Sequence, residues 1–334
     1  ADALKHLQRC CAQRNYRLDA ANRKQALLPE GVSIVANATG SAVGFKTTFQ
    51  GCLIYCTPGV PSELHGMLDR EILPQLQRHF RPIEPVTITR LRIFGMGESR
   101  LQQRINDRFP QWPDKLELGF RAGLPLLELK LTSRDDSASE LHRQWRERLE
   151  REFGDYIIGT DEQTLPQCVV EILQTHGKTL CTAESCTGGL IASQIVAIAG
   201  ASQAFEAGYV SYANHVKQSA LGVSAGALEQ HGAVSEAVVR EMAEGALQRS
   251  SSDLVIAVSG IAGPDGGTPD RPAGTVWIAW GERGALQARL FFIPGSRSFV
   301  QQLVAAIGLD LVRRQLQGIT TEPRDFKDRA PRRR

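Results

Sequence analysis

The chain has 334 residues, 42% of them apolar and 22% charged, a composition typical of a globular protein with two or three domains. It contains no apolar run long enough to cross a bilayer, so no membrane segment is expected. The net charge of +3 comes from the tail, residues 322–334, and the remaining residues are neutral, which gives little electrostatic reason to expect nucleic acid as a partner.

Cysteine usage and the first residues bear on the compartment. No CxxC pair occurs among the seven cysteines, so neither a redox motif nor a zinc site is indicated, and a reducing cytoplasm is expected. The first residues lack the basic and apolar segments of a signal peptide. Cys186 lies beside a glycine turn, where it is either a reactive thiol or a buried spectator, and burial is the favoured interpretation.

Residues 1–80 are expected to form a partial α/β domain. A helix opens the segment, and a short buried strand is predicted at 51–56. Two prolines and a glycine then form a turn, after which Ser62 is expected to cap a helix over residues 63–79. Residues 37–44 form a loop rich in glycine and small polar side chains.

Residues 81–158 are expected to form a small α+β domain. A half-exposed strand is predicted over 85–94 by its alternation of apolar and polar residues, and a helix follows to about Arg108. A hairpin over 116–131 and an amphipathic helix over 137–153 complete a split βαβ pattern. The segment shows no chemical motif, and a structural spacer is expected.

Helices and strands alternate over residues 159–317, which predicts a three-layer α/β domain with a mixed sheet. Thr164 is expected to cap the first helix and Gly177 to end it. Strands are predicted around residue 180 and over 205–212, 253–259, 275–280 and 288–293. The later helices are predicted over 190–198, 235–248 and 298–316. The basic tail, 318–334, is expected to be disordered.

Polar loops at strand ends are where ligands bind in open α/β sheets. In the predicted α/β domain such loops cover residues 184–189, 200–202, 259–274 and 295–297. Glycines in the long third loop would let backbone N–H groups approach a ligand closely. Asp265 and Asp270 lie in that loop, but two carboxylates without a third ligand give little support for a metal site.

Lys217 is the most informative single residue. Tyr212 ends a predicted strand and Asn214 is a good N-cap, which places Lys217 in the first turn of a helix. There its charge opposes the helix dipole by about 0.3–1 kcal/mol, and partial burial would lower its pKa toward that of a general base for a serine nucleophile. An exposed lysine near a helix start is the alternative interpretation.

The third domain resembles the C-terminal domain of the CinA family. The resemblance rests on motifs in family order, which are AESCTGG (183–189), AG-x-S (199–202), YVSYANHVK (209–217), HGAVS (231–235), SGIAGPDGG (259–267), PAGTVWIA (272–279) and PGSR (294–297). It implies an amidohydrolase that deamidates nicotinamide mononucleotide to nicotinic acid mononucleotide and ammonia. It also implies Ser202 as nucleophile, Lys217 as base and Tyr212 as a relay or orienting group. The substrate-binding residues expected are Glu184, Ser185, Thr187, Gly188, Gly189, Gly200, Ser259, Gly260, Gly263 and Arg297, and Arg297 is expected near the substrate phosphate.

The first part resembles only the second half of the family's molybdopterin-binding-like N-terminal domain, through KQALLPEG (24–31), NATGSAVGF (37–45) and TPGVPSEL (57–64). Ala38 and Val43 stand where prolines are usual in the family. The resemblance implies ADP-ribose pyrophosphatase activity for a complete domain of this kind, and a divalent metal is expected only if this N-terminal part is active. No metal or cofactor is expected for deamidation.

The sequence leaves two other functions open. The chain is alternatively a non-catalytic pyridine-nucleotide-binding module, or it retains pyrophosphatase chemistry in its N-terminal part. Apolar strands in an incomplete domain favour a homo-oligomer, most simply a dimer.

Overall fold

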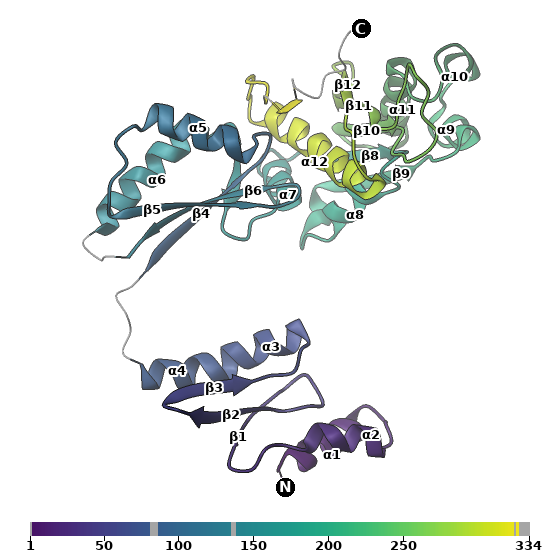
Figure 1. Ribbon diagram of the computed structural model, residues 1–334. Helices are drawn as coiled ribbons and strands as arrows, with labels where there is room; N and C mark the ends of the chain where they lie inside the picture. Colours follow the sequence, from purple (N-terminus) through teal and green to yellow (C-terminus); the bar gives the residue numbers. More distant parts are fainter. Residues whose placement is uncertain (1, 81–85, 135–137, 324, 327–334) are drawn as a thin grey trace. The chain divides into compact units, whose positions relative to one another are not determined.

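The computed structural model describes residues 2–80, 86–134, 138–323 and 325–326 (Figure 1). The chain divides into two compact units, residues 1–85 and 86–334. The mixture of helices and sheets confirms the predicted α/β class. Within the described ranges, no helix combines the length and apolarity needed to cross a membrane.

The first unit is an antiparallel sheet in the order β1-β2-β3, with helices against one face. Its elements are α1 (Asp2–Gln13), α2 (Ala20–Arg23), β1 (Ser33–Val35), β2 (Gly44–Phe49), β3 (Cys52–Cys56), α3 (Pro61–Met67) and α4 (Leu73–His79). Val35 and Tyr55 pack against Met67, at the end of α3, and Ile72, which lies between α3 and α4. The opposite face exposes the alternate residues of the strands, Phe49 and Ile54 among them. The predicted homo-oligomer stays a prediction.

The helix predicted from Glu63 differs from expectation in two ways. It begins at Pro61, with Val60 as N-cap, so Ser62 is not the cap. It is also interrupted by a π-helical turn, Leu68–Ile72, before α4 continues it. Pro74 has no N–H to donate to the preceding turn, and this missing donor accounts for the change in hydrogen bonding.

The second unit begins with a four-stranded antiparallel sheet in the order β5-β6-β4-β7. Its elements are β4 (Thr87–Ile93), α5 (Glu98–Arg108), β5 (Leu116–Ala122), β6 (Leu127–Ser133), α6 (Ser139–Phe153) and β7 (Ile157–Thr160). The two helices lie on one face of the sheet (Figure 1) and bury Leu101, Leu149 and Phe153 against it. The starts of the predicted strand at residue 85 and helix at residue 137 lie outside the described residues.

A five-stranded mixed sheet follows, in the order β12-β11-β10-β8-β9. Its strands are β8 (Leu180–Glu184), β9 (Phe205–Val210), β10 (Leu254–Gly260), β11 (Thr275–Glu282) and β12 (Gln287–Phe292). β8 runs parallel to both β9 and β10, whereas β11 is antiparallel to β10 and β12. The predicted mixed sheet is therefore confirmed.

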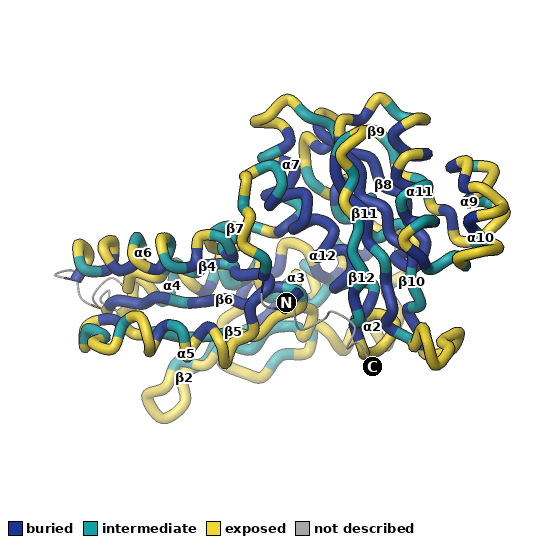
Figure 2. The backbone as a smooth tube through the Cα atoms, turned by 90° about the horizontal axis from the view of Figure 1, so that it is seen from above, coloured by how far each residue is buried: buried dark blue, intermediate teal, exposed yellow. Residues whose placement is uncertain are grey.

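Helices cover both faces of this mixed sheet. They are α7 (Leu165–Thr175), α8 (Leu190–Val196), α9 (Asn214–Leu221), α10 (Ala225–His231), α11 (Glu236–Arg249) and α12 (Arg297–Leu316). α7, α8 and α12 bury one set of strand residues, such as Ile256 and Val258, and α11 buries the alternate set, such as Val255 and Ala257. The central strands are accordingly the dark core of Figure 2.

The caps of this domain follow the sequence. Thr164 accepts from the N–H of Gln167 at the start of α7, and Gly177 follows its end with a φ of 61°. Ser235 caps α11 in the same way. The short helix α10, capped by Ser224, was not predicted.

The described part of the tail corrects the prediction of disorder. Phe326 is buried, with its ring edge-on to both Phe94 and Phe291. Arg289 donates to the carbonyl of Phe326 and pairs with Glu322. The free energy gained by burying the Phe326 ring outweighs the preference of this charged segment for solvent. Residues 324 and 327–334 lie outside the described residues.

Candidate active site

The carboxyl ends of β8, β9, β10 and β12 meet at one edge of the mixed sheet, because these four strands point the same way. Three of the predicted loops, 184–189, 259–274 and 295–297, leave the sheet at this edge, as do residues 211–217. β9 and β10 lie on opposite sides of β8. In open α/β sheets ligands bind beyond the strand ends at such a reversal of strand order, and this place, around residues 185–187 and 211–217, is called the crevice below.

Lys217 is buried in this crevice, with 1% of its surface exposed. Its Nζ donates to Ser185 Oγ at 3.1 Å, to the carbonyl of Ser211 at 2.8 Å and to that of Tyr212 at 3.2 Å. Three acceptors match the three protons of an ammonium group. A neutral amine would instead donate to the two carbonyls and turn its lone pair to the Ser185 hydroxyl.

Burial makes that neutral form accessible. Loss of hydration lowers the pKa of Lys217, and the nearby Cys186 opposes this only in part. Of the described residues, none brings a carboxylate to Nζ within ion-pairing distance. The pKa of Lys217 is therefore lowered mainly by burial and not by the helix dipole. Ala213 is the N-cap, and the predicted cap, Asn214, is the first helical residue.

The turn after Ser185 is organised by a buried carboxylate. Glu184 is fully buried, and its two oxygens accept from the backbone N–H groups of Gly189, Ile191 and Ala192. Glu184 was predicted to bind substrate, but its side chain instead holds the start of α8. The turn around Gly188 (φ 66°) and Gly189 (φ 96°) requires glycine conformations, which explains both residues without a ligand.

Two backbone donors of this turn are left over. The N–H groups of Cys186 and Thr187 have no acceptor within the described ranges, and the buried Thr187 hydroxyl has none either. Unpaired buried polar groups are costly, so they mark a place where a polar ligand is accommodated. These donors lie directly after Ser185 in the chain. This arrangement resembles the strand–turn–helix junctions in which the residue after a nucleophile supplies an oxyanion donor.

Ser202 does not belong to this site. It lies in a 3₁₀ turn, Ala201–Gln203, that precedes β9, whereas Lys217 follows the other end of that strand. β9 has six residues, so about 20 Å separates its ends. The opposite sheet edge also carries Gly200, whose carbonyl accepts from Gln174. Both residues were predicted as site residues, and the structure shows that they lie at the wrong edge.

Arg297 and Tyr212 lie together at the mouth of the crevice. Arg297, the first residue of α12, donates from Nη2 to the Tyr212 hydroxyl at 3.0 Å and from Nη1 to the carbonyl of Gly263 at 3.2 Å. The two side chains are exposed, 62% for Tyr212. Tyr212 therefore reaches Lys217 through its backbone carbonyl, while its hydroxyl points to Arg297.

Ser259 and Gly260 have mainly structural contacts. Ser259 is buried, and its hydroxyl donates to the carbonyl of Ala233 at 2.6 Å, which fixes the segment before α11. A Cβ on Gly260 would lie 2.6 Å from a methyl of Val276, so close strand packing explains this glycine.

The Cys186 side chain is buried, as predicted. It is fully buried, and desolvation raises the pKa of its thiol to about 12. Its carbonyl accepts from Gln301 of α12 at 2.8 Å, a contact that ties α12 to the turn and that sequence reasoning missed. The carbonyls of Ser211 and Tyr212 were missed as well, because no side-chain pattern reports backbone acceptors.

Fold and site together define an α/β protein with a buried lysine–serine pair at the switch point of a mixed sheet. Residues 162–316 match the model of the CinA C-terminal domain, and residues 89–159 match that of the damage-inducible protein CinA KH domain. The chain belongs to the CinA family.

Two relatives show the extent of this relationship. A CinA-like protein of Colwellia psychrerythraea is 48% identical over 332 residues, which are 98% of this chain and 77% of that protein. A CinA-like protein of Shewanella sediminis is 39% identical over 91% of this chain and 72% of its own length. The crystal structure of competence/damage inducible protein CihA from Agrobacterium tumefaciens has 35% identity, covers 46% of this chain and 93% of that one, and has a TM-score of 0.44.

Proposed function

We propose that the chain is an amidohydrolase that deamidates nicotinamide mononucleotide, with Ser185 as nucleophile and Lys217 as general base. The observation that carries this proposal is the 3.1 Å hydrogen bond between Lys217 Nζ and Ser185 Oγ in a buried position. Ser185 replaces Ser202 in this role. A nucleophile and its base need to lie within hydrogen-bond reach, and among the described residues Ser185 is the serine that Lys217 Nζ reaches.

The first half of the proposed reaction forms an ester. The neutral Lys217 amine takes the Ser185 proton while Oγ bonds to the carboxamide carbon, and the carbonyl electrons move to oxygen. The N–H groups of Cys186 and Thr187 are the donors we propose for this oxyanion, since they have no other acceptor in the described ranges. The C–N bond then breaks, and the Lys217 ammonium gives its proton to the departing nitrogen, which leaves as ammonia.

The second half uses water. Lys217, neutral again, takes a proton from a water molecule that attacks the ester carbon. The bond from carbon to Oγ breaks, the proton returns to Ser185, and the nicotinic acid mononucleotide is released. The carbonyls of Ser211 and Tyr212 hold the amine in one orientation through both halves. These steps use only side chains and backbone groups of the chain.

Arg297 is the proposed contact for the substrate phosphate. It is an exposed guanidinium at the mouth of the crevice, and planar Arg donors suit phosphate oxygens. The hydrogen bond from Arg297 to Tyr212 orients it there.

The test is release of ammonia from nicotinamide mononucleotide by the purified full chain. Ser185→Ala should reduce kcat by about 10⁴-fold or more, because the nucleophile is lost. Ser202→Ala serves as the matched control and should keep the parental rate. Tight binding of the mononucleotide without any turnover would instead favour a binding module and overturn the proposal.

A further inference from the structure

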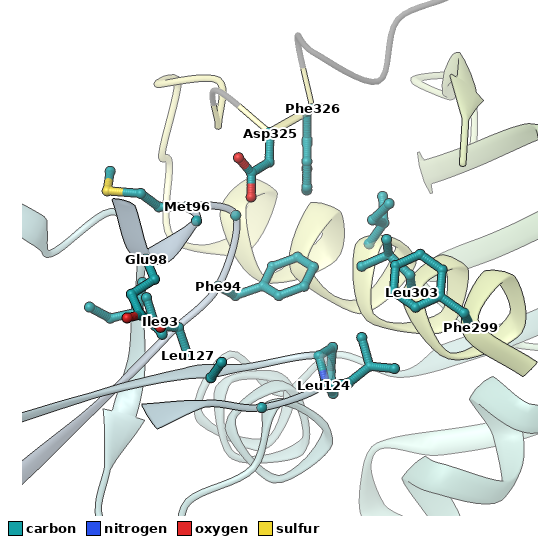
Figure 3. Close-up of a pocket in the computed structure, with 16 residues that line it drawn as sticks. Ile93, Phe94, Met96, Glu98, Leu124, Leu127, Phe299, Leu303, Asp325 and Phe326 are labelled. Carbon is teal, nitrogen blue, oxygen red and sulfur yellow. The ribbon is translucent and has the colours of Figure 1, made fainter. Parts of the chain in front are cut away.

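A cavity of about 240 Å³ lies in the second unit, between the small antiparallel sheet and α12 (Figure 3). Its walls are mostly apolar. Phe94, Met96 and Leu127 come from the small sheet and the loop after β4, Phe299 and Leu303 come from α12, and Phe326 comes from the tail. Five of these six side chains are less than 10% exposed, so the walls are held by the core around them.

The polar groups of the cavity have one sign. Glu98 and Asp325 line it, and no Lys, Arg or His of the described residues does. Asp325 also pairs with Arg100 at 3.8 Å, a residue outside the lining. Because Arg100 offsets the charge of Asp325, the carboxylate of Glu98 is the group that makes this apolar cavity favour a cation over an anion.

The size of the cavity limits the ligand. An apolar cavity of about 150 Å³ is known to hold benzene. The present volume therefore accepts one aromatic ring with a short substituent, and the walls offer Phe94 and Phe299 as ring partners (Figure 3). Ligand sites occur preferentially where two domains meet, and this cavity lies between the small antiparallel sheet and α12 of the mixed-sheet domain.

We propose that this cavity binds a small aromatic amine in its protonated form, with the ring among the phenylalanines and the ammonium group toward Glu98. The proposal is independent of the deamidase reaction. The cavity is nevertheless close to the proposed phosphate contact, because Phe299 in its wall follows Arg297 by two residues on α12. A ligand in the cavity contacts the helical turn that carries Arg297.

The test uses calorimetric titration of the full chain with three probes of one shape, benzylamine, benzyl alcohol and benzoate. Benzylamine should bind with a dissociation constant of about 1 mM, and benzoate at least about tenfold more weakly. Leu303→Trp fills the cavity and should remove binding of both benzylamine and benzyl alcohol. Absence of saturable benzylamine binding up to about 10 mM, or equal binding by the Leu303→Trp variant, overturns the proposal.

A second variant covers the case in which Leu303→Trp does not fold. Glu98 is exposed, so Glu98→Gln should fold normally. It should weaken benzylamine by about threefold or more and leave benzyl alcohol unchanged. Glu140→Gln is the matched control, since Glu140 also lies in the first turn of a helix but outside the cavity. Equal weakening by both substitutions, or none by Glu98→Gln, contradicts the proposed position of the ammonium group.

Discussion

Replacement of Lys217 by Met should abolish most of the proposed amidohydrolase activity while the fold is kept. Methionine is of similar length and removes the amine that contacts Ser185 Oγ. A positioned general base contributes about 10²–10⁴-fold, which corresponds to about 3–5 kcal/mol of barrier. We therefore expect kcat to fall by that factor and KM to change by less than about threefold, because the amine contacts the nucleophile and not the mouth of the crevice.

The assay is ammonia release followed from about pH 5 to pH 10. Only the neutral amine accepts a proton, so the parental rate should rise with pH and level off above the folded-state pKa of Lys217. Burial places that pKa below the ordinary 10.5. Lys217→Met should show no such rise. Lys178→Met is a suitable control, since Lys178 pairs with Glu282 at the opposite sheet edge. A Lys217→Met rate within tenfold of the parent, or an unchanged pH midpoint, would refute the role of the base.

The same pKa shift has a consequence for stability. Below its folded-state pKa, Lys217 carries the full cost of a buried charge, and this cost is relieved as pH rises toward 10.5. The unfolding free energy of the parent relative to Lys217→Met should therefore increase with pH across that window, because the unfolded chain binds more protons there. Denaturant unfolding at several pH values measures it, and a decrease with pH would contradict the assigned direction.

Three further substitutions or reactions follow from the site. Arg297→Gln should raise KM for the mononucleotide by about tenfold or more with kcat within about threefold, and an unchanged KM would remove Arg297 from the phosphate. Glu184→Gln should lower the unfolding free energy by about 1–3 kcal/mol in urea, because an amide nitrogen cannot accept from the backbone N–H groups at the start of α8. A stability within experimental error of the parent would speak against that capping role. Iodoacetamide should modify the exposed Cys52 well before Cys186, whose thiol has a pKa of about 12, and equal labelling by mass spectrometry would contradict its burial.

Local signals in the sequence account for much of the second unit. The cap at Thr164, the apolar run of β10 and the alternation of helices with strands were enough to predict the mixed sheet. Features that depend on distant partners were not predictable. Phe326 stands in a charged tail, and only the rings of Phe94 and Phe291 explain its burial. The π-helical turn before Pro74 has a local cause instead, because one missing donor changes the hydrogen bonding of an otherwise continuous helical pattern.

The error over the nucleophile has a simple geometric cause. Ser202 and Lys217 bracket a single strand, and a strand carries its two ends to opposite edges of a sheet. Glu184, Tyr212 and Ser259 all lie at or just beyond the ends of parallel strands, whereas Ser202 precedes one. Strand direction was therefore a signal that could have excluded Ser202 and favoured Ser185. The burial of Lys217 was not predictable, because its acceptors are mainly backbone carbonyls.

The most direct measurement is the rate of ammonia release from nicotinamide mononucleotide by the parent chain, Ser185→Ala and Ser202→Ala under identical conditions. The buried contact between Lys217 and Ser185 predicts a parent and a Ser202→Ala variant of equal rate, with Ser185→Ala lower by about 10⁴-fold or more. Loss of activity in Ser202→Ala with retention in Ser185→Ala would contradict the account.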